Sequence, residues 1–142
     1  MKYLLDTCVI SELIKKKPKM GIVNWIKHKD ELDMYLSVLT IGELQKGVFK
    51  LKESRKKQNL MQWVESDLVK RFENRILAVT DTVARKWGEI QGKAEQEGKK
   101  MPVVDSLIAA TGITYDLQVV TRNIEDMKIS GVKLYNPWNA KP

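Results

Sequence analysis

The chain has 142 residues, of which 43% are hydrophobic and 30% charged, an ordinary balance for one globular domain and not that of a disordered chain. No apolar run approaches the roughly 20 residues of a membrane-spanning helix, and Asp6 interrupts the apolar stretch that a secretory signal would continue. We therefore expect one domain over residues 1–142, in the cytoplasm and with no membrane partner. The single cysteine, Cys8, fits that reducing compartment.

The net charge of +7 raises the odds of a polyanionic partner, although a lysine-rich coat that only aids solubility is the alternative. The only histidine, His28, lies in a polar segment and receives no role. A mechanism that needs two imidazoles is thereby excluded, and a histidine-rich zinc or iron site is disfavoured. Any metal would be held by oxygen ligands.

In the first half of the chain, hydrophobic spacing predicts two strands and four helices. The expected elements are a strand at 3–5, helices at 7–16 and 21–29, a strand at 34–38, a helix at 41–51 and a long charged helix at 52–71. Trp25 and Trp63 fall at core positions of these helices and are expected to pack rather than to stack on bases.

In the second half the same alternation continues. The expected elements are a strand at 76–79, helices at 82–97 and 103–114, and strands at 117–121 and 132–135. Trp87 is again a core position. Strands that alternate with helices predict an α/β three-layer sandwich, in which helices flank a central parallel sheet of about five strands.

Ligands of such sheets bind beyond the carboxyl ends of the strands, and acids occur at such positions here. Asp6 directly follows the first strand, where it is also a favoured N-cap for the next helix. Glu43 lies just after the second strand; the alternative is a first-turn glutamate that only satisfies the helix dipole. Asp105 opens an apolar helix after Pro102, and its alternative role is again an N-cap.

Together the three acids indicate more than each does alone. Converging carboxylates repel one another unless a cation lies between them, and magnesium or manganese is the hard cation that carboxylate and phosphate oxygens prefer. Acidic clusters with such ions cleave phosphodiesters. The pattern therefore favours a magnesium- or manganese-dependent nuclease.

Five segments resemble PIN-domain proteins of the VapC and FitB type, in the same order and over nearly the whole chain. They are Leu4 to Leu13, Thr40 to Val48, Pro102 to Ala110, Val119 to Asn123 and Asn136 to Trp138. The resemblance implies a parallel sheet wrapped by helices, a homodimer, and a metal-dependent ribonuclease that cuts RNA as the toxin of a toxin–antitoxin pair. A cognate antitoxin protein would hold it inactive.

By that resemblance, Asp6, Glu43 and Asp105 match the metal-binding acids of the family, and the fourth acidic position falls on Asn123. An amide there weakens a second metal, so that Asn123 would bind weakly or through water. Asn123 is also a good N-cap, and Asp126 would then return a capping interaction to its backbone. The alternative is that Asp126 is itself the fourth acid.

Residues around these acids are candidates for supporting roles. Thr7 and Thr121 would orient a carboxylate or water, and Arg122 would contact a substrate phosphate. Two basic clusters would contact the RNA backbone or form a solvated face: Lys46, Lys50, Lys52, Arg55, Lys56 and Lys57 in one, and Arg85 with Lys86 in the other.

Two rival interpretations remain. A receiver-like signalling domain would share the expected sheet topology, but it requires two adjacent acids after the first strand, where this chain has Asp6 followed by Thr7. A PIN fold that binds RNA or a protein partner without cutting is the other. Asn123 allows that second interpretation, and the three retained acids argue against it.

Overall fold

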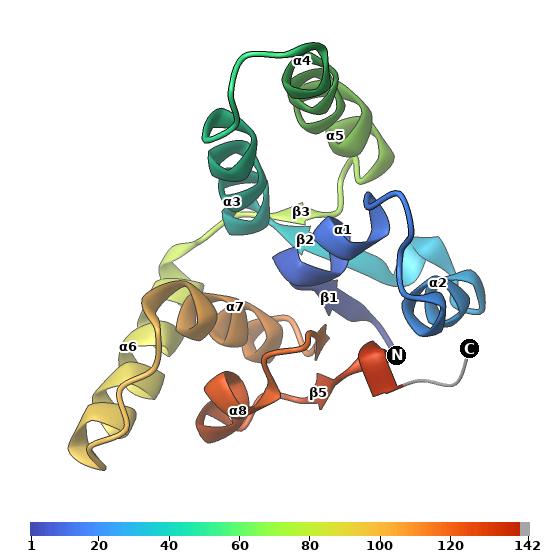
Figure 1. Cartoon of the computed structure of the whole chain (residues 1–142). Coiled ribbons are helices and arrows are strands. Elements are labelled where there is room, and N and C mark those ends of the chain that lie inside the picture. Colours follow the sequence, from blue (N-terminus) through green and yellow to red (C-terminus); the bar gives the residue numbers. More distant parts are fainter. Residues whose placement is uncertain (140–142) are drawn as a thin grey trace.

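The computed structural model describes residues 1–139, and its centre is a five-stranded parallel sheet. The strands are β1 (Tyr3–Leu5), β2 (Met34–Ser37), β3 (Ile76–Leu77), β4 (Gln118–Val120) and β5 (Leu134–Tyr135). Their order across the sheet is β3-β2-β1-β4-β5, and every neighbouring pair is parallel. The predicted α/β three-layer sandwich is confirmed (Figure 1).

Helices connect the strands and cover the sheet. The α-helices are α1 (Thr7–Leu13), α2 (Met20–Lys27), α3 (Val38–Phe49), α4 (Arg55–Gln62), α5 (Val69–Arg71), α6 (Asp81–Gln96), α7 (Val103–Thr114) and α8 (Ile124–Met127). The other helical segments are the π-helix η2 (Trp63–Leu68) and the 3-10 helices η1 (Glu31–Asp33), η3 (Lys128–Ser130) and η4 (Pro137–Asn139). Within residues 1–139, no helix is both long and apolar enough to cross a membrane.

Alternation along the strands separates two cores. In β1, Tyr3 and Leu5 pack among residues of α1, α2, α3 and η2, whereas Leu4 packs among residues of α6 and α7. In β4, Val120 belongs to the first core and Val119 to the second. Successive side chains of a strand point to opposite faces, so the sheet is apolar on both sides, as a parallel sheet covered by helices must be.

The close packing of α7 on the sheet depends on a glycine. A Cβ atom added to Gly112 would lie 2.8 Å from Cγ2 of both Val119 and Val132, and 3.3 Å from the carbonyl oxygen of Leu117. The helix therefore approaches β4 at a distance that no side chain at this position would permit. The contact holds the last turn of α7 against β4.

Several helix bounds differ from the predicted ones, and polar caps set two of the new starts. α1 ends at Leu13 rather than at residue 16. α3 begins at Val38 rather than at residue 41, because the Ser37 hydroxyl accepts a 3.0 Å hydrogen bond from the Leu39 N–H as an N-cap. The long helix predicted at 52–71 begins at Arg55 behind the Ser54 cap, and it runs through α4, η2 and α5.

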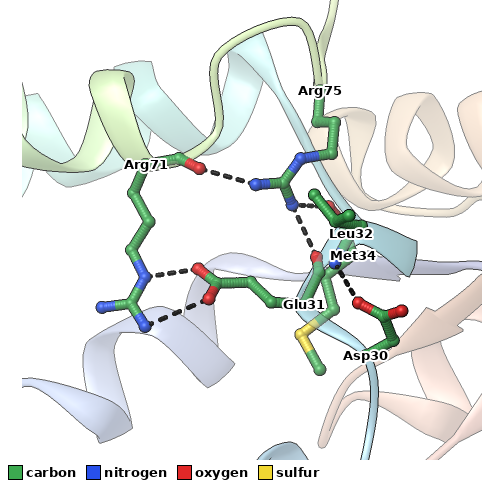
Figure 2. A network of polar contacts seen from close by, with 6 residues as sticks. All are labelled: Asp30, Glu31, Leu32, Met34, Arg71 and Arg75. Atoms are coloured by element: carbon green, nitrogen blue, oxygen red, sulfur yellow. Dashed lines mark hydrogen bonds and ion pairs between the residues drawn. The ribbon is translucent and has the colours of Figure 1, made fainter.

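A cluster of polar contacts fixes the entry to β2 against the end of α5 (Figure 2). The guanidinium of Arg75 donates to the backbone oxygens of Glu31 at 2.6 Å, Met34 at 2.7 Å and Arg71 at 2.6 Å. The side chain of Arg71 pairs with the Glu31 carboxylate. Arg75, which directly precedes β3, therefore links the turn before β2, the first residue of β2 and the end of α5 through their carbonyls.

The strand order corrects one sequence-based statement. Receiver-like domains use the order 2-1-3-4-5, in which the third strand lies next to the first. Here β1 lies between β2 and β4, and β3 is at the edge. The topology itself therefore separates this chain from the receiver class, which was expected to share it and was set aside only for its missing pair of acids. The order reverses between β1 and β4, and α/β sheets bind ligands at such a point.

Candidate active site

The site begins where β1 and β4 end side by side. Leu5 pairs with Val120 in the sheet, and the Asp6 N–H donates to the Val120 carbonyl at 3.0 Å. The next residues along the two strands, Asp6 and Thr121, therefore leave the sheet together. The Thr121 hydroxyl donates to Oδ2 of Asp6 at 2.7 Å. The strand order reverses here, so this pair lies at the expected ligand position.

Asp6 combines the two roles that the sequence left open. Its Oδ1 accepts from the Thr7 N–H at 2.8 Å, so the residue is the N-cap of α1. Its side chain also lines a pocket of about 340 Å³, although the residue is only 4% exposed. Burial raises the pKa of Asp6 above its ordinary value, against the lowering effect of the hydrogen bonds from Thr121 and Thr7.

The pocket is polar, and elements far apart in the sequence contribute to it. Its lining residues are Asp6, Thr7, Cys8, Ser11, Glu12, Lys15, Glu43, Asp105, Arg122 and Asn123. The structure thus brings together the four predicted ligand positions Asp6, Glu43, Asp105 and Asn123, with Thr7 and Arg122. Thr121 lies behind Asp6 as a fully buried support, and it is not a lining residue.

Glu43 reaches the pocket from α3. Because α3 begins at Val38, Glu43 is in the second helical turn, and the alternative of a first-turn glutamate that serves the helix dipole is wrong. The Thr7 hydroxyl donates to Oε1 of Glu43 at 2.5 Å. Thr7 thereby joins the start of α1 to α3 and orients a carboxylate, which is the supporting role predicted for it.

Asp105 reaches the pocket from the first turn of α7. The N-cap of α7 is Pro102, so the alternative in which Asp105 only caps its helix is wrong. The pKa of Asp105 is raised to about 6 by burial first, and then by the negative charges of Asp6, Asp126 and Glu43. Asp6, Asp126 and Glu43 are thus close enough to Asp105 to raise its pKa.

The loop after β4 differs in detail from the prediction. Asn123 is at the N-cap position of α8, but its side chain makes no capping hydrogen bond and lines the pocket instead. The backbone N–H of Asn123 donates to the Thr121 hydroxyl at 2.9 Å. The predicted capping interaction from Asp126 to this N–H is therefore wrong, because Thr121 already occupies it. Asp126 is exposed and is not a lining residue of the pocket.

Sequence reasoning missed a row of pocket residues on α1 and just after its end. Cys8, Ser11, Glu12 and Lys15 line the pocket beside the predicted residues. Their spacing carried the signal: Thr7 and Ser11, like Cys8 and Glu12, are four residues apart and share a helix face. Glu12 is 7% exposed, accepts from the Lys15 ammonium at 2.8 Å and from the Lys19 N–H at 3.1 Å, and has a lowered pKa because of these contacts.

The basic clusters are only partly available to a substrate. Lys57 is buried, pairs with Glu53 at 2.8 Å and donates to the Phe49 carbonyl, so its predicted contact with RNA is wrong. Arg85 pairs with Asp81 and Lys86 with Glu89, both within α6. The remaining members of the first cluster, Lys46, Lys50, Lys52, Arg55 and Lys56, are exposed.

The tryptophans behave as predicted. Trp25 lies edge-on to Tyr3 and stacks on Tyr135, with centroid separations of 5.1 and 5.3 Å. Trp63 packs against the first core. Trp87 packs against the second core, and its indole N–H donates to Ser106 at 2.9 Å.

The fold and the acidic pocket match a known class of proteins. Residues 3–128 match the PIN domain family. The chain is 35% identical over 136 residues to "Toxin FitB" of Neisseria gonorrhoeae, an alignment that covers 96% of this chain and 98% of that protein. The crystal structure of FitAcB from the same organism superposes with a TM-score of 0.91 over 96% of this chain and 99% of the solved one, at 35% identity.

A further relative is the "VapC ribonuclease Y4jK" of Sinorhizobium fredii, which is 28% identical over 135 residues and 95% of this chain. That alignment covers 96% of the relative. The chain therefore belongs to the PIN domain family and, within it, to the toxins of the FitB and VapC type.

Proposed function

We propose that this protein is an endoribonuclease that hydrolyses RNA phosphodiester bonds with magnesium or manganese, and that it is the toxin of a toxin–antitoxin pair. The observation that carries the proposal is the convergence of Asp6, Glu43 and Asp105 on one polar pocket at the strand-order reversal. The relatives named as a toxin and as a VapC ribonuclease support it.

The donor set of the pocket fits a hard divalent cation. Its acids offer oxygen ligands. Burial, and after it the neighbouring negative charges, raise the pKa of Asp6 and of Asp105, and a bound cation would oppose both effects. Within residues 1–139, however, no three acidic, histidine or cysteine side chains already lie close enough together to enclose one ion. A cation would therefore have to draw the carboxylates of Asp6, Glu43 and Asp105 inward.

Such an ion, when bound, would activate water and stabilise the leaving oxygen of a phosphodiester. The residues of the chain prepare the site for it. Thr121 and the Thr7 N–H keep the Asp6 carboxylate in one orientation, and the Thr7 hydroxyl does the same for Glu43. Asn123 offers a neutral amide oxygen beside them, directly or through water. Arg122 offers a cation for a substrate phosphate at the edge of the same pocket.

An inhibitor and a second copy of the chain complete the proposal. A cytoplasmic nuclease with cellular RNA as substrate would damage its own cell, so a cognate antitoxin protein is expected to block the acidic pocket. A basic side chain of that antitoxin would replace the charge of the metal. The family resemblance further supports a homodimer as the working form.

The runner-up is a non-catalytic PIN fold that binds RNA or a protein partner. Asn123 is the residue that favours it, because an amide in place of a fourth acid reduces the charge available to a second metal. Buried acids gathered in one pocket are an unfavourable arrangement for a protein that has no use for them, since burial and then the neighbouring negative charges raise the pKa of Asp105.

Cleavage of RNA by the purified chain tests the proposal. We expect cleavage with magnesium or manganese, none in EDTA, and none in Asp6→Asn, where the amide oxygen can still accept the Thr7 N–H as the N-cap and the amide nitrogen takes the place of the oxygen that faces Thr121. Lys133→Gln is the control and should cleave normally, because Lys133 precedes the amino end of β5 whereas the pocket lies at the carboxyl ends of β1 and β4. Cleavage that persists in EDTA or in Asp6→Asn would contradict the mechanism, and RNA binding without cleavage would favour the runner-up.

A further inference from the structure

One cation at the edge of the acidic pocket is oriented by an aromatic ring. The guanidinium carbon of Arg122 lies 4.9 Å from the ring centroid of Trp138, and Arg122 lines the pocket. Within residues 1–139, its side chain forms no hydrogen bond or ion pair, although Asp6, Glu12 and Asp105 line the same pocket. An arginine whose role was only structural would be expected to pair with one of these acids.

The ring beneath Arg122 is itself firmly placed. Trp138 packs against the first core, follows the buried Pro137, and donates its backbone N–H to Oδ1 of Asn136 at 2.9 Å. The segment before it is part of the sheet, because the Thr121 N–H donates to the Tyr135 carbonyl at 2.9 Å. Thr121, next to Arg122, is thus hydrogen-bonded to Tyr135, which lies three residues before Trp138. This backbone contact brings the side chains of Arg122 and Trp138 together.

This arrangement leaves the guanidinium ready for an anion. A guanidinium has five N–H donors in a planar fork that matches two phosphate oxygens, and none of them is used by the described part of the chain. An exposed arginine normally samples many rotamers, and ordering it on binding costs entropy. A ring that already holds the guanidinium flat removes part of that cost before the ligand arrives.

We propose that Trp138 is a positioning residue, which holds the Arg122 guanidinium at the pocket edge so that it binds a phosphate of the RNA strand next to the bond to be cut. The inference rests on the proposed ribonuclease function and extends it to the C-terminal turn η4. An alternative role for Trp138, in which its own ring stacks on an RNA base, is separated from this one by the experiment.

The experiment measures the affinity of a fluorescently labelled, single-stranded RNA of mixed sequence for the full chain. Asp6→Asn is the background, so that the RNA stays intact. Trp138→Leu should weaken binding about two- to fivefold, and Trp138→Phe less, because phenylalanine retains a ring. Arg122→Gln should weaken it about tenfold or more. In Arg122→Gln, the further change Trp138→Leu should have no effect, since Trp138 acts through Arg122.

Salt dependence supplies a readout that a packing defect does not change. Each phosphate contact adds about −0.7 to the slope of log affinity against log salt for single strands. Trp138→Leu removes no charge, and yet it should reduce this slope as Arg122→Gln does, because the guanidinium no longer meets the phosphate. Lys133→Gln removes one charge far from the pocket and should leave both affinity and slope unchanged. Thermal melting of each variant reports whether η4 still packs.

Three outcomes would overturn the inference. An unchanged affinity and slope in Trp138→Leu would show that Arg122 needs no support. Additive losses in the double variant, with an unchanged salt slope in Trp138→Leu, would show instead that the ring contacts RNA itself. Absence of RNA binding and of metal-dependent cleavage by the unmodified chain would remove the proposed function as well. Cleavage by the unmodified chain together with either of the first two results would refute the role of Trp138 alone.

Discussion

Thr121 donates its hydroxyl to Oδ2 of Asp6 at 2.7 Å, and the same hydroxyl oxygen accepts the Asn123 N–H at 2.9 Å. One buried side chain thus joins the acid that follows β1 to the loop that follows β4. The contact lowers the pKa of Asp6 and partly offsets the rise that burial causes. Thr121 is therefore expected to matter for both the stability and the pH dependence of the site.

Thr121→Val, which retains the shape but not the hydroxyl, tests this. The Asp6 carboxylate and the Asn123 N–H would each lose a partner, so unfolding should become about 1–3 kcal/mol easier. The pKa of Asp6 should rise further, and the pH at which cleavage is half-maximal should move upward. Denaturant unfolding and a pH profile of cleavage measure the two effects. Thr121→Ser, which restores the hydroxyl, should recover both; failure of that recovery would refute the hydrogen bond as the cause.

Asp105 predicts a pH dependence of stability in metal-free buffer. Its pKa is about 6 in the folded protein and about 3.9 in an unfolded chain. Between these values the folded state retains a proton that the unfolded state has lost, so the contribution of Asp105 to stability falls as the pH rises from about 4 to about 6. Asp105→Asn has no such proton, and it should therefore gain stability relative to the unmodified chain over that window. Denaturant unfolding in EDTA at several pH values would show a constant difference if Asp105 titrated normally.

Magnesium should favour the stability of the unmodified chain over that of Asp105→Asn, whereas the pH effect favours the variant. An ion that binds only the folded site stabilises it in proportion to its affinity. Added magnesium should raise the melting temperature of the unmodified chain more than that of Asp105→Asn, because the variant has lost one carboxylate. Equal shifts in both proteins would show that Asp105 is not a ligand.

The loop after β4 yields a paired prediction. Asn123→Asp adds a carboxylate to the pocket and should lower the magnesium concentration needed for half-maximal cleavage. Asp126→Ala removes a charge that raises the pKa of Asp105, so that pKa should fall while cleavage is largely retained. Titration of cleavage with magnesium measures the first effect and the pH profile the second. An inactive Asp126→Ala, with Asn123→Asp indifferent to metal, would instead identify Asp126 as the fourth acid.

Gly112 allows a matched test of the packing that places α7. Gly112→Ala inserts a methyl group 2.8 Å from two valine methyls and should destabilise the protein by about 1–3 kcal/mol. Gly92→Ala in α6, where nothing lies within 4 Å of the new Cβ, should stabilise it by about 0.5–1 kcal/mol through helix propensity. Denaturant unfolding compares the two variants. Similar effects at both positions would show that α7 can shift away from β4 without loss.

Local patterns in the sequence determined the elements and the acids. The alternation of apolar runs predicted the parallel sheet and its flanking helices. The spacing of the apolar residues in each run shows whether it is a strand or a helix, and which of its faces is buried. Asp6 follows a strand so apolar that it must lie in the core. The sequence therefore predicted correctly that Asp6 stands at the end of a buried strand. Helix starts were less readable: that of α3 is set by the Ser37 cap, four residues before the first periodic position, Ile41.

Only the tertiary structure decided which groups meet. The order β3-β2-β1-β4-β5 places β4 beside β1, and no local pattern encodes that pairing between residues more than one hundred apart. It brings the Thr121 hydroxyl within hydrogen-bond distance of Asp6. The same hydroxyl, and not Asp126, accepts the Asn123 N–H. The strand order also places the Arg122 guanidinium over the ring of Trp138. These contacts depend on backbone positions that the whole sheet and its two cores impose together, and a sequence window of one helix or strand does not contain them.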